Sequence, residues 1–487
     1  MISKFVKEQK RYSQADLCKI FECSEQRVIP LIRRLKEYGI LKVVKATDSQ
    51  KQLSDLMEED IELADVEVGS NDLFYVFTFV GVIMITGIVL KCYPKYIHSQ
   101  AEPTKELKQI LKVIEQYNSK RQAVRLFNED NHVASFNRLP VLLYLLQDFF
   151  ENGVYVNTDE VIESNGNGEI LWERTINETF TILVNDRPYY IDLQTKRRKT
   201  DDFDYFKRLH ECVITLASKE LEASGLLELF ELTEVDLSDE SVDDFGDYDY
   251  ILYRIEQELN VQFNTRKQLV LKMIYAYIAN QNALDTSESL CFYGTNSFNL
   301  VWEDVCADVF NNQLSVPLKN LKMPLPLSNK YEPNIQLIDV IDKPKWMGIS
   351  QLGQRFWKEA DTLIPDIVSV ADNNGQSGMF ILDAKYYNIQ LDYSKPLRGQ
   401  PGIESITKQY LYHLAYREFA RDHRLSFVKN CFLLPTEDAM LICTGEVSLK
   451  MMDDLGLEKI QVRSLPATQM YELYLSHQIL PLNKLKL

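Results

Sequence analysis

The chain has 487 residues and carries 71 acidic against 54 basic side chains, a formal net charge of −17. Its apolar share of 45% and its charged share of 26% are those of a folded protein, which excludes wholesale disorder. The length predicts about two to four domains. The negative charge argues against a protein that coats nucleic acid by bulk positive charge, but it does not exclude a local basic site.

Residues 11–46 have the pattern of two short helices followed by a strand. Ser13 and Ser24 are candidate N-caps, and Gly39 ends the second helix before an apolar strand. This order predicts a winged helix within residues 1–50, a segment with eleven basic and six acidic side chains. Such a domain binds either DNA or another protein. The candidate DNA-binding residues on the second helix are Arg27, Arg33 and Arg34.

An uncharged stretch of eighteen residues, 73–90, has nearly the length of a membrane span. Its Phe, Tyr, Val and Ile content suits strands, and Gly81 and Gly87 interrupt it at strand-like intervals. We therefore expect two or three buried strands and no membrane association. The N-terminus lacks an apolar signal segment and the eight cysteines form no Cys-x-x-Cys pair, so a cytoplasmic protein without structural zinc is expected.

Two segments concentrate the negative charge. Residues 51–72 contain eight acids and one Lys, which predicts an exposed linker. Residues 228–249 contain ten acids and no base, which predicts a solvated or flexible surface. Between them, the short basic run at residues 196–199 is interpreted as a solvated loop, with a phosphate contact as the alternative. No Gly-x-x-x-x-Gly-Lys-Ser/Thr loop is present, so the chain is not expected to hydrolyse a nucleotide itself.

A predicted β-hairpin carries the residues with the clearest chemistry. Its strands cover residues 364–370 and 379–387, and they are joined by a turn rich in Asn and Gly. Asp366 lies near the start of the first strand and Asp383 near the end of the second, so their carboxylates could meet. Lys385 projects from the same face as Asp383. Two carboxylates can hold Mg²⁺, and a Lys can stabilise the charge that grows on a phosphate, which suits phosphodiester hydrolysis.

Two predicted helices flank this hairpin in sequence. On the first, residues 298–310, Glu303 lies at the border of an apolar arc, where it is either a third acid of the site or a plain surface residue. On the second, residues 403–420, Gln409 and Tyr412 share a face. They either line a DNA groove or belong to the edge of an amphipathic helix.

The order Glu303, Pro365-Asp366 and Asp383-Ala384-Lys385 resembles the PD-(D/E)XK nuclease superfamily. The wider segments 301–303, 363–368 and 381–387, with residues 79–83 and 90–97, resemble LlaJI-type restriction endonucleases, which are McrC-like subunits of restriction systems. The resemblance extends from about residue 70 to 435.

This resemblance implies a Mg²⁺-dependent endonuclease, with Mn²⁺ as an alternative metal, that cleaves foreign double-stranded DNA together with a separate McrB-like AAA+ GTPase. It implies metal ligation by Glu303, Asp366, Asp383 and the carbonyl of Ala384, with Lys385 as the catalytic lysine. Related nucleases often carry Gln-x-x-x-Tyr on the following helix, whereas His413 here takes the Tyr position after Gln409.

The expected architecture is a multidomain α+β or α/β chain whose nuclease core is a mixed sheet flanked by helices. Two alternative functions remain: a winged-helix DNA-binding or assembly protein with a degenerate nuclease fold, and a DNA repair nuclease. The expected segments are a winged helix at 1–50, an acidic linker at 51–72, a β-rich and helical middle region at 73–265, and a nuclease domain at 266–487.

Overall fold

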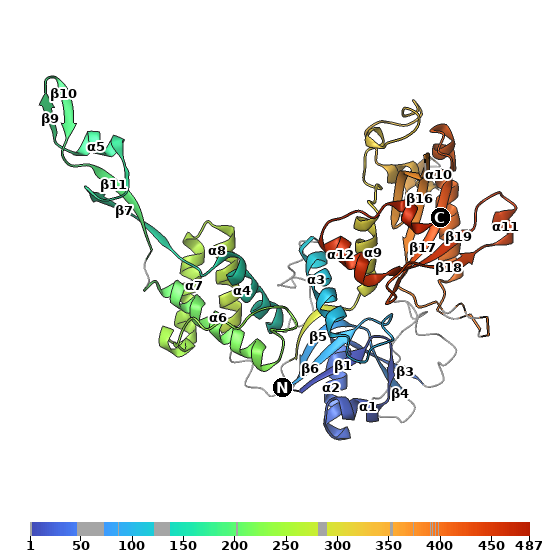
Figure 1. Ribbon diagram of the computed structural model, residues 1–487, viewed down its shortest axis with the longest axis horizontal. Coiled ribbons are helices and arrows are strands. Elements are labelled where there is room, and N and C mark those ends of the chain that lie inside the picture. Colours follow the sequence, from blue (N-terminus) through green and yellow to red (C-terminus); the bar gives the residue numbers. More distant parts are fainter. Residues whose placement is uncertain are drawn as a thin grey trace. The chain divides into compact units, whose positions relative to one another are not determined.

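The computed structural model of the protein describes residues 2–45, 73–85, 87–120, 137–200, 203–280, 290–350, 354–373, 375–389, 391, 393–394, 396–397 and 399–487 (Figure 1). The chain divides into two compact units. The first unit comprises Met1–Ile2, Met84–Gly87 and Asp130–Phe292, and the second comprises Ser3–Ile83, Ile88–Glu129 and Tyr293–Leu487. The predicted acidic linker, residues 51–72, lies outside the described residues.

Four packed helices form the body of the first unit: α4 (Arg138–Asn152), α6 (Tyr205–Ala223), α7 (Tyr248–Val261) and α8 (Thr265–Ala279). Arg266 of α8 pairs with the buried Asp148 of α4, with Nη2 2.8 Å from Oδ2. The expected boundary between residues 265 and 266 therefore falls inside α8. Because α8 packs on α4 and α7, the first unit continues to Phe292.

The acidic residues 228–249 pack against α6, so the expectation of a solvated or flexible segment was wrong for part of it. The Val235 amide donates to Ser218 Oγ (2.8 Å), and Phe245 is buried in a short 3₁₀ turn. Most of the carboxylates lie exposed. Apolar side chains thus anchor the segment, while its charges face water.

A β-arm extends from the helical body. Its elements are β7 (Thr158–Ser164), β8 (Glu169–Ile170), α5 (Trp172–Glu178), β9 (Thr181–Val184), β10 (Arg187–Tyr190) and β11 (Gln194–Thr200). The basic residues 196–199, expected in a loop, belong to β11, which pairs antiparallel with β7. Arg197 Nε lies 2.8 Å from Glu163 Oε1, so part of this charge is neutralised across the strands.

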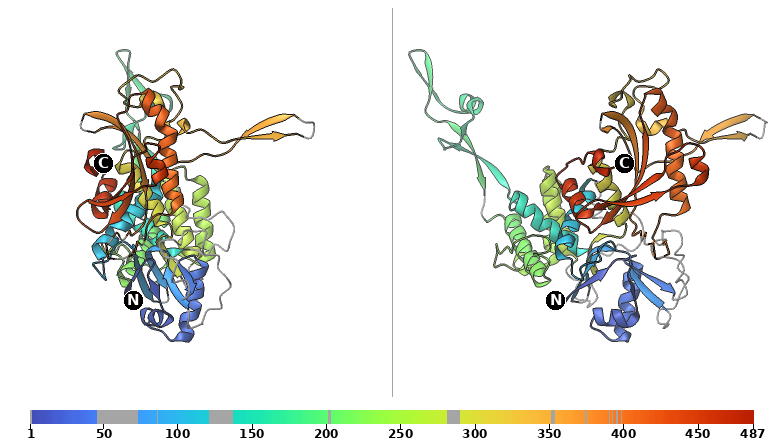
Figure 2. Two further views of the ribbon diagram at one scale, coloured as in Figure 1. Left: turned by 90° about the vertical axis from the view of Figure 1, so that its right-hand side faces the viewer. Right: turned by 45° about the vertical axis from the view of Figure 1, so that its right-hand side comes forward.

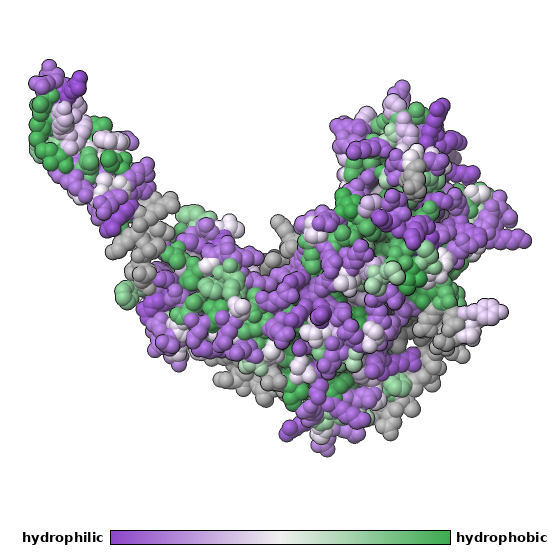
Figure 3. Space-filling model, viewed as in Figure 1, coloured by the Kyte–Doolittle hydropathy of each residue, from purple (hydrophilic) through white to green (hydrophobic). Residues whose placement is uncertain are grey.

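The end of this arm, residues 180–191, exposes large apolar side chains and is called the arm tip below. Phe180, Leu183 and Ile191 are 91%, 70% and 65% exposed. Hydrophobic residues gather at this end of the space-filling view (Figure 3). The arm tip has no core of its own, which is typical of a surface that another protein covers.

The second unit begins with two helices and two small strand groups. The elements are β1 (Ile2–Lys7), β2 (Arg11–Tyr12), α1 (Gln14–Ile20), α2 (Glu25–Glu37), β3 (Leu41–Lys45) and β4 (Leu73–Phe77). Ser13 Oγ accepts from the Asp16 amide (3.1 Å), and Gly39 adopts a positive φ of +66° after α2. The predicted helix starts and the strand after Gly39 are confirmed. Strand β4 pairs antiparallel with both β2 and β3.

The uncharged stretch 73–90 forms strands, as expected: β4, β5 (Val80–Ile85) and β6 (Ile88–Tyr93). A four-stranded sheet has the order β1-β6-β5-β12, in which β12 is Leu290–Thr295, and helix α3 (Thr104–Lys120) follows β6. Among the described residues, no helix is long and apolar enough to cross a membrane.

A five-stranded mixed sheet, β15-β16-β17-β19-β18, forms the C-terminal part of the second unit. Its strands are β15 (Ile367–Asn373), β16 (Gln376–Ala384), β17 (Val428–Thr436), β18 (Ile442–Val447) and β19 (Ile460–Pro466). The helices are α9 (Phe298–Val309), α10 (Ile403–Asp422), α11 (Lys450–Asp453) and α12 (Ala467–Leu475). Strand β16 is antiparallel to β15 and parallel to β17.

Alternating side chains of β16 pack into two different cores. Phe380 and Leu382 pack into the core that contains α9 and α12. Met379 and Ile381 pack into the core that contains α10. Since successive side chains of a strand point to opposite faces, the sheet lies between α9 and α10. A further hairpin, β13 (Lys345–Ile349) with β14 (Arg355–Glu359), stands away from this core and is coloured light orange in Figure 2.

Gly81 permits β5 and β12 to approach closely, so Gly81→Ala should destabilise the second unit. A Cβ at this position would lie 2.1 Å from Tyr293 O and 2.6 Å from Gly294 Cα. We expect the Tm in thermal unfolding to fall by on the order of 5 °C. The matched control is Gly402→Ala, because Gly402 has no atom within 4 Å of its Cβ position and a φ of −65°. Equal Tm values for the two variants would contradict this packing.

Candidate active site

The two acids of the predicted hairpin meet at its open end. Ile367 pairs with Leu382, so in the same register Asp366 lies directly opposite Asp383. Their carboxyl groups share a hydrogen bond, and Asp366 Oδ2 also accepts from the Ala384 amide (2.9 Å). Burial and the neighbouring Asp383 carboxylate raise the pKa of Asp366 well above its usual range. The structure therefore places the two carboxyl groups side by side, as the hairpin pattern predicted.

Lys385 lies on the same side as Asp383. Its Nζ is 3.0 Å from Asp383 Oδ2, and both side chains are largely buried. Burial acts to lower the pKa of Lys385, but the carboxylates of Asp383, Asp366 and Glu303 raise it above its ordinary value. The ammonium group therefore stays charged at neutral pH and neutralises part of the acid cluster.

Glu303 reaches the same place from helix α9. The helix is fixed to the sheet by Trp302, whose buried Nε1 donates to Leu433 O (3.1 Å). Glu303 is half-buried and lines one cavity together with Lys385. Its charge contributes to the raised pKa of Asp366, which places Glu303 within electrostatic reach of the hairpin acids. Glu303 and Lys385 thus share a cavity, and Lys385 in turn contacts Asp383, which lies opposite Asp366.

The Pro365-Asp366 corner is held by two side chains, Asn312 and Tyr412, whose positioning role the sequence did not predict. Asn312 Nδ2 donates to Asp366 O (2.9 Å), while Asn312 Oδ1 accepts from the Val368 amide (3.1 Å). The Tyr412 hydroxyl donates to Ile364 O (2.9 Å). Asn312 follows α9 outside any periodic pattern, so no sequence signal pointed to it.

Gln409 and Tyr412 do not line an exposed groove. Gln409 is fully buried and its Nε2 donates to Ile381 O (2.8 Å), so it braces β16 from α10. Tyr412 is 6% exposed, with its hydroxyl engaged as described above. His413, at the position where related nucleases carry Tyr, contacts Asn430 Nδ2 through Nδ1 (3.0 Å). The prediction that these residues contact DNA is therefore replaced by a role in positioning the sheet.

The arginines of the second N-terminal helix lie apart from the acid cluster. Arg27 and Arg33 are exposed on α2, and Arg34 is half-buried. None of the three lines the cavity of Glu303 and Lys385. Their assignment as DNA-binding residues stays a prediction.

The acid cluster offers a suitable donor set for one hard divalent cation. Asp383 helps to raise the pKa of the opposed Asp366, which indicates a place where positive charge is favourable. Mg²⁺ typically takes one or two carboxylates and keeps several waters. Among the described residues, no three acid, His or Cys side chains form a ready-made metal cluster. Asp366, Asp383 and the Ala384 carbonyl therefore fit a partly hydrated ion, with Glu303 nearby.

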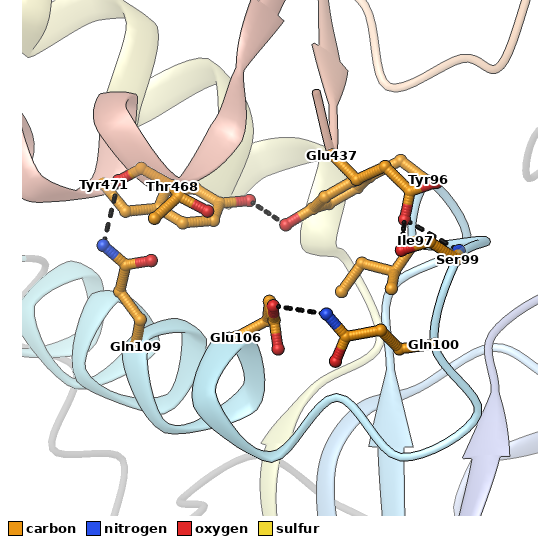
Figure 4. A pocket seen from close by; sticks show the side chains of 9 residues that line it. All are labelled: Tyr96, Ile97, Ser99, Gln100, Glu106, Gln109, Glu437, Thr468 and Tyr471. Atoms are coloured by element: carbon orange, nitrogen blue, oxygen red, sulfur yellow. Dashed lines mark hydrogen bonds between the residues drawn. The ribbon is translucent and has the colours of Figure 1, made fainter. Parts of the chain in front are cut away.

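A second, smaller cavity of about 50 Å³ is unrelated to this chemistry (Figure 4). Here Glu437 Oε2 accepts from the amides of His98 (2.8 Å) and Ser99 (3.0 Å). The buried hydroxyls of Tyr96 and Tyr471 lie 3.0 Å apart. These contacts fasten the segment after β6 to the C-terminal part, so the cavity belongs to a structural joint.

Comparison with known proteins places these residues in a family context. The model of the LlaJI restriction endonuclease family matches residues 79–465. The type II restriction enzyme BsuMI component YdjA of Bacillus subtilis (strain 168) is 28% identical over 423 residues, which cover 85% of this chain and 83% of the relative. The segments that resembled LlaJI-type proteins lie within the matched range.

Solved structures give only distant similarity. A half-complex from a tetradecameric assembly of Thermococcus gammatolerans McrB AAA+ hexamers with bound McrC has a TM-score of 0.35 at 13% identity, covering 97% of this chain and 99% of that chain. A Thermococcus gammatolerans McrBC complex has a TM-score of 0.25 at 12% identity, covering 62% and 84%.

The raised pKa of Asp366 is expected to make the stability of the folded protein depend on pH. A buried carboxyl with a raised pKa destabilises the folded state increasingly as pH rises above about 4, since the unfolded chain loses that proton more easily. Asp366→Asn removes this penalty, so the Tm of the metal-free protein at pH 8 should rise by on the order of 2–4 °C.

Mg²⁺ should stabilise the wild type and not this variant, because binding to the folded state alone raises stability. Thermal unfolding with and without Mg²⁺ measures both effects. Asp372→Asn, an exposed acid on the same hairpin, is the control. An Asp366→Asn variant less stable than this control at pH 8 would contradict the burial argument.

Proposed function

Because its residues 79–465 match the family model, the chain belongs to the LlaJI restriction endonuclease family, and we propose that it is the Mg²⁺-dependent nuclease subunit of a restriction system. Its substrate would be foreign double-stranded DNA, cleaved by phosphodiester hydrolysis. The observation that carries the proposal is the meeting of Asp366, Asp383 and Lys385 at one end of a mixed sheet, with Glu303 of α9 on the cavity that Lys385 lines.

Each residue of the cluster has a defined task in this proposal. Asp366 and Asp383 present carboxylate oxygens from opposite strands, and the Asn312 amide keeps the Asp366 backbone in place. Lys385 Nζ can hold a water beside the scissile phosphate and stabilise the negative charge that develops there. Glu303 adds a carboxylate to the lining of the cavity beside Lys385. When bound, Mg²⁺ would polarise the phosphate and lower the pKa of a water.

The arrangement of elements supports the finer fold assignments that we propose. The sheet β15-β16-β17-β19-β18 between α9 and α10 is consistent with a PD-(D/E)XK core whose acids lie at the ends of the hairpin. The order β2, α1, α2, β3, β4 is consistent with a winged helix whose wing is the β3–β4 pair.

Loss of Asp383 or Lys385 should abolish cleavage. Asp383→Ala removes a metal ligand and Lys385→Ala removes the stabilising charge, so we expect cleavage of phage or plasmid DNA to fall by about a thousandfold or more. The assay uses the full chain with Mg²⁺ and its cognate AAA+ protein. EDTA should stop the reaction, and Mg²⁺ or Mn²⁺ should restore it.

Asp372→Ala is the matched control for these substitutions, since Asp372 is an exposed acid on the same hairpin. It should retain cleavage. If Asp383→Ala and Lys385→Ala cut as well as this control, the chain is a binding or assembly protein rather than the nuclease. A repair nuclease would cleave without the AAA+ protein or a neighbouring methyltransferase gene.

We propose a McrB-like AAA+ GTPase as the protein partner, in keeping with the absence of a phosphate-binding loop in this sequence. The arm tip is the surface of the first unit that best suits a protein partner. Its exposed residues include several large aliphatic and aromatic side chains, among them Leu183, which is 70% exposed on β9. An apolar surface of this kind fits a hydrophobic groove on another protein.

Leu183→Asp should weaken the partner interaction without unfolding the chain. A charge in an apolar interface costs on the order of 2 kcal/mol, so partner-stimulated cleavage at limiting partner concentration should drop about tenfold or more. Asp186→Asn, in the turn of the same hairpin, should leave it unchanged. If both variants respond equally to the AAA+ protein in a titration, the arm tip is not its binding surface.

A further inference from the structure

The cavity beside the candidate catalytic residues also receives residues from the N-terminal part of the second unit. It has a volume of about 420 Å³, large enough for a short stretch of sugar–phosphate backbone. Glu303 and Lys385 line it together with Lys42 from β3 and Lys408 from α10. The C-terminal residues around Lys385 therefore form only part of the cavity lining.

A buried polar contact fixes the N-terminal segment at this cavity. The Tyr386 hydroxyl donates to the buried carboxylate of Glu8, and the Lys95 amide donates to the same oxygen, Glu8 Oε2 (3.1 Å). The Lys95 ammonium lies 4.5 Å from the centre of the Tyr386 ring. Because Tyr386 directly follows Lys385, Glu8 and its neighbours are held next to the candidate catalytic lysine.

Two of the four lysines that line the cavity already have partners. Lys385 pairs with Asp383, and Lys95 Nζ donates to Gln9 Oε1 (3.0 Å). In the part of the chain that the structure describes, Lys42 and Lys408 form no ion pair. Glu404, one helical turn before Lys408, also lines the cavity but makes no ion pair with it there.

We propose that Lys42 and Lys408 bind phosphates of the DNA strand that lies in this cavity beside the scissile bond. A lysine ammonium group that lies in a cleft and has no ion-pair partner there can bind a phosphate oxygen. The inference rests on the proposed function, because that function supplies DNA as the ligand. It also assigns DNA contact by the N-terminal part to β3, at the predicted wing, rather than to the arginines of α2.

Binding of DNA by the full chain tests this inference without cleavage. Anisotropy of a labelled duplex of about 30 base pairs, measured over a range of salt concentrations without Mg²⁺, gives the slope of log K against log[salt]. Lys42→Ala and Lys408→Ala should each reduce that slope by about 1 and weaken binding about five- to tenfold at low salt. The double variant should lose about 2 in slope.

Charge-conserving and distant substitutions serve as controls. Lys42→Arg and Lys408→Arg should retain the wild-type slope, because they keep the positive charge. Lys19→Ala, on exposed α1 and outside the cavity, should also retain it. If Lys42→Ala and Lys408→Ala behave like Lys19→Ala, or if Arg27→Ala and Arg33→Ala change the slope instead, the inference is wrong.

The two proposals fail in different ways. A chain that shows the expected slopes but never cleaves DNA with Mg²⁺ and its partner would overturn the nuclease assignment and support the phosphate contacts. A chain that cleaves DNA while Lys42→Ala and Lys408→Ala bind and cut as the wild type does would overturn the phosphate contacts alone.

Discussion

The repulsion between Asp366 and Asp383 is the constraint on which the C-terminal part of this protein depends. The half-buried Asp366 lies opposite the buried Asp383, and Lys385 neutralises only part of their charge. Left to themselves they would separate or take up protons. Contacts with backbone groups hold them: the Ala384 amide binds one carboxylate, and the Asn312 amide fixes the strand that carries it. The fold thus maintains an acid pair at a cost in stability.

The sheet itself provides the stiffness that this constraint requires. The side chains of β16 alternate between two cores, so the strand is clamped from both faces. Trp302 ties α9 to β17 through a buried hydrogen bond, and Gln409 ties α10 to β16. An acid at the end of such a strand cannot move away from its neighbour without disturbing a core, because protein interiors are closely packed.

Local patterns in the sequence predicted much of this arrangement. The caps at Ser13 and Gly39, the strands of the uncharged stretch, and the hairpin that brings Asp366 to Asp383 all follow from short-range rules of period and turn chemistry. The burial of Gln409 against β16 could not be predicted in this way. A helical wheel shows which residues share a face, but it does not show that this face covers a sheet. The cavity lined by Lys42 and Lys408 depends on contacts between distant segments, which no local pattern encodes.

The contact between Glu8 and Tyr386 bears on how such a protein could evolve. Here the residue after the candidate catalytic lysine donates its hydroxyl to the carboxylate of Glu8, which directly follows the first strand of the chain and is buried. Separating the core from this N-terminal segment would leave a polar group without its partner in an apolar place. The N-terminal segment and the hairpin of Asp366 and Asp383 are therefore expected to be inherited together.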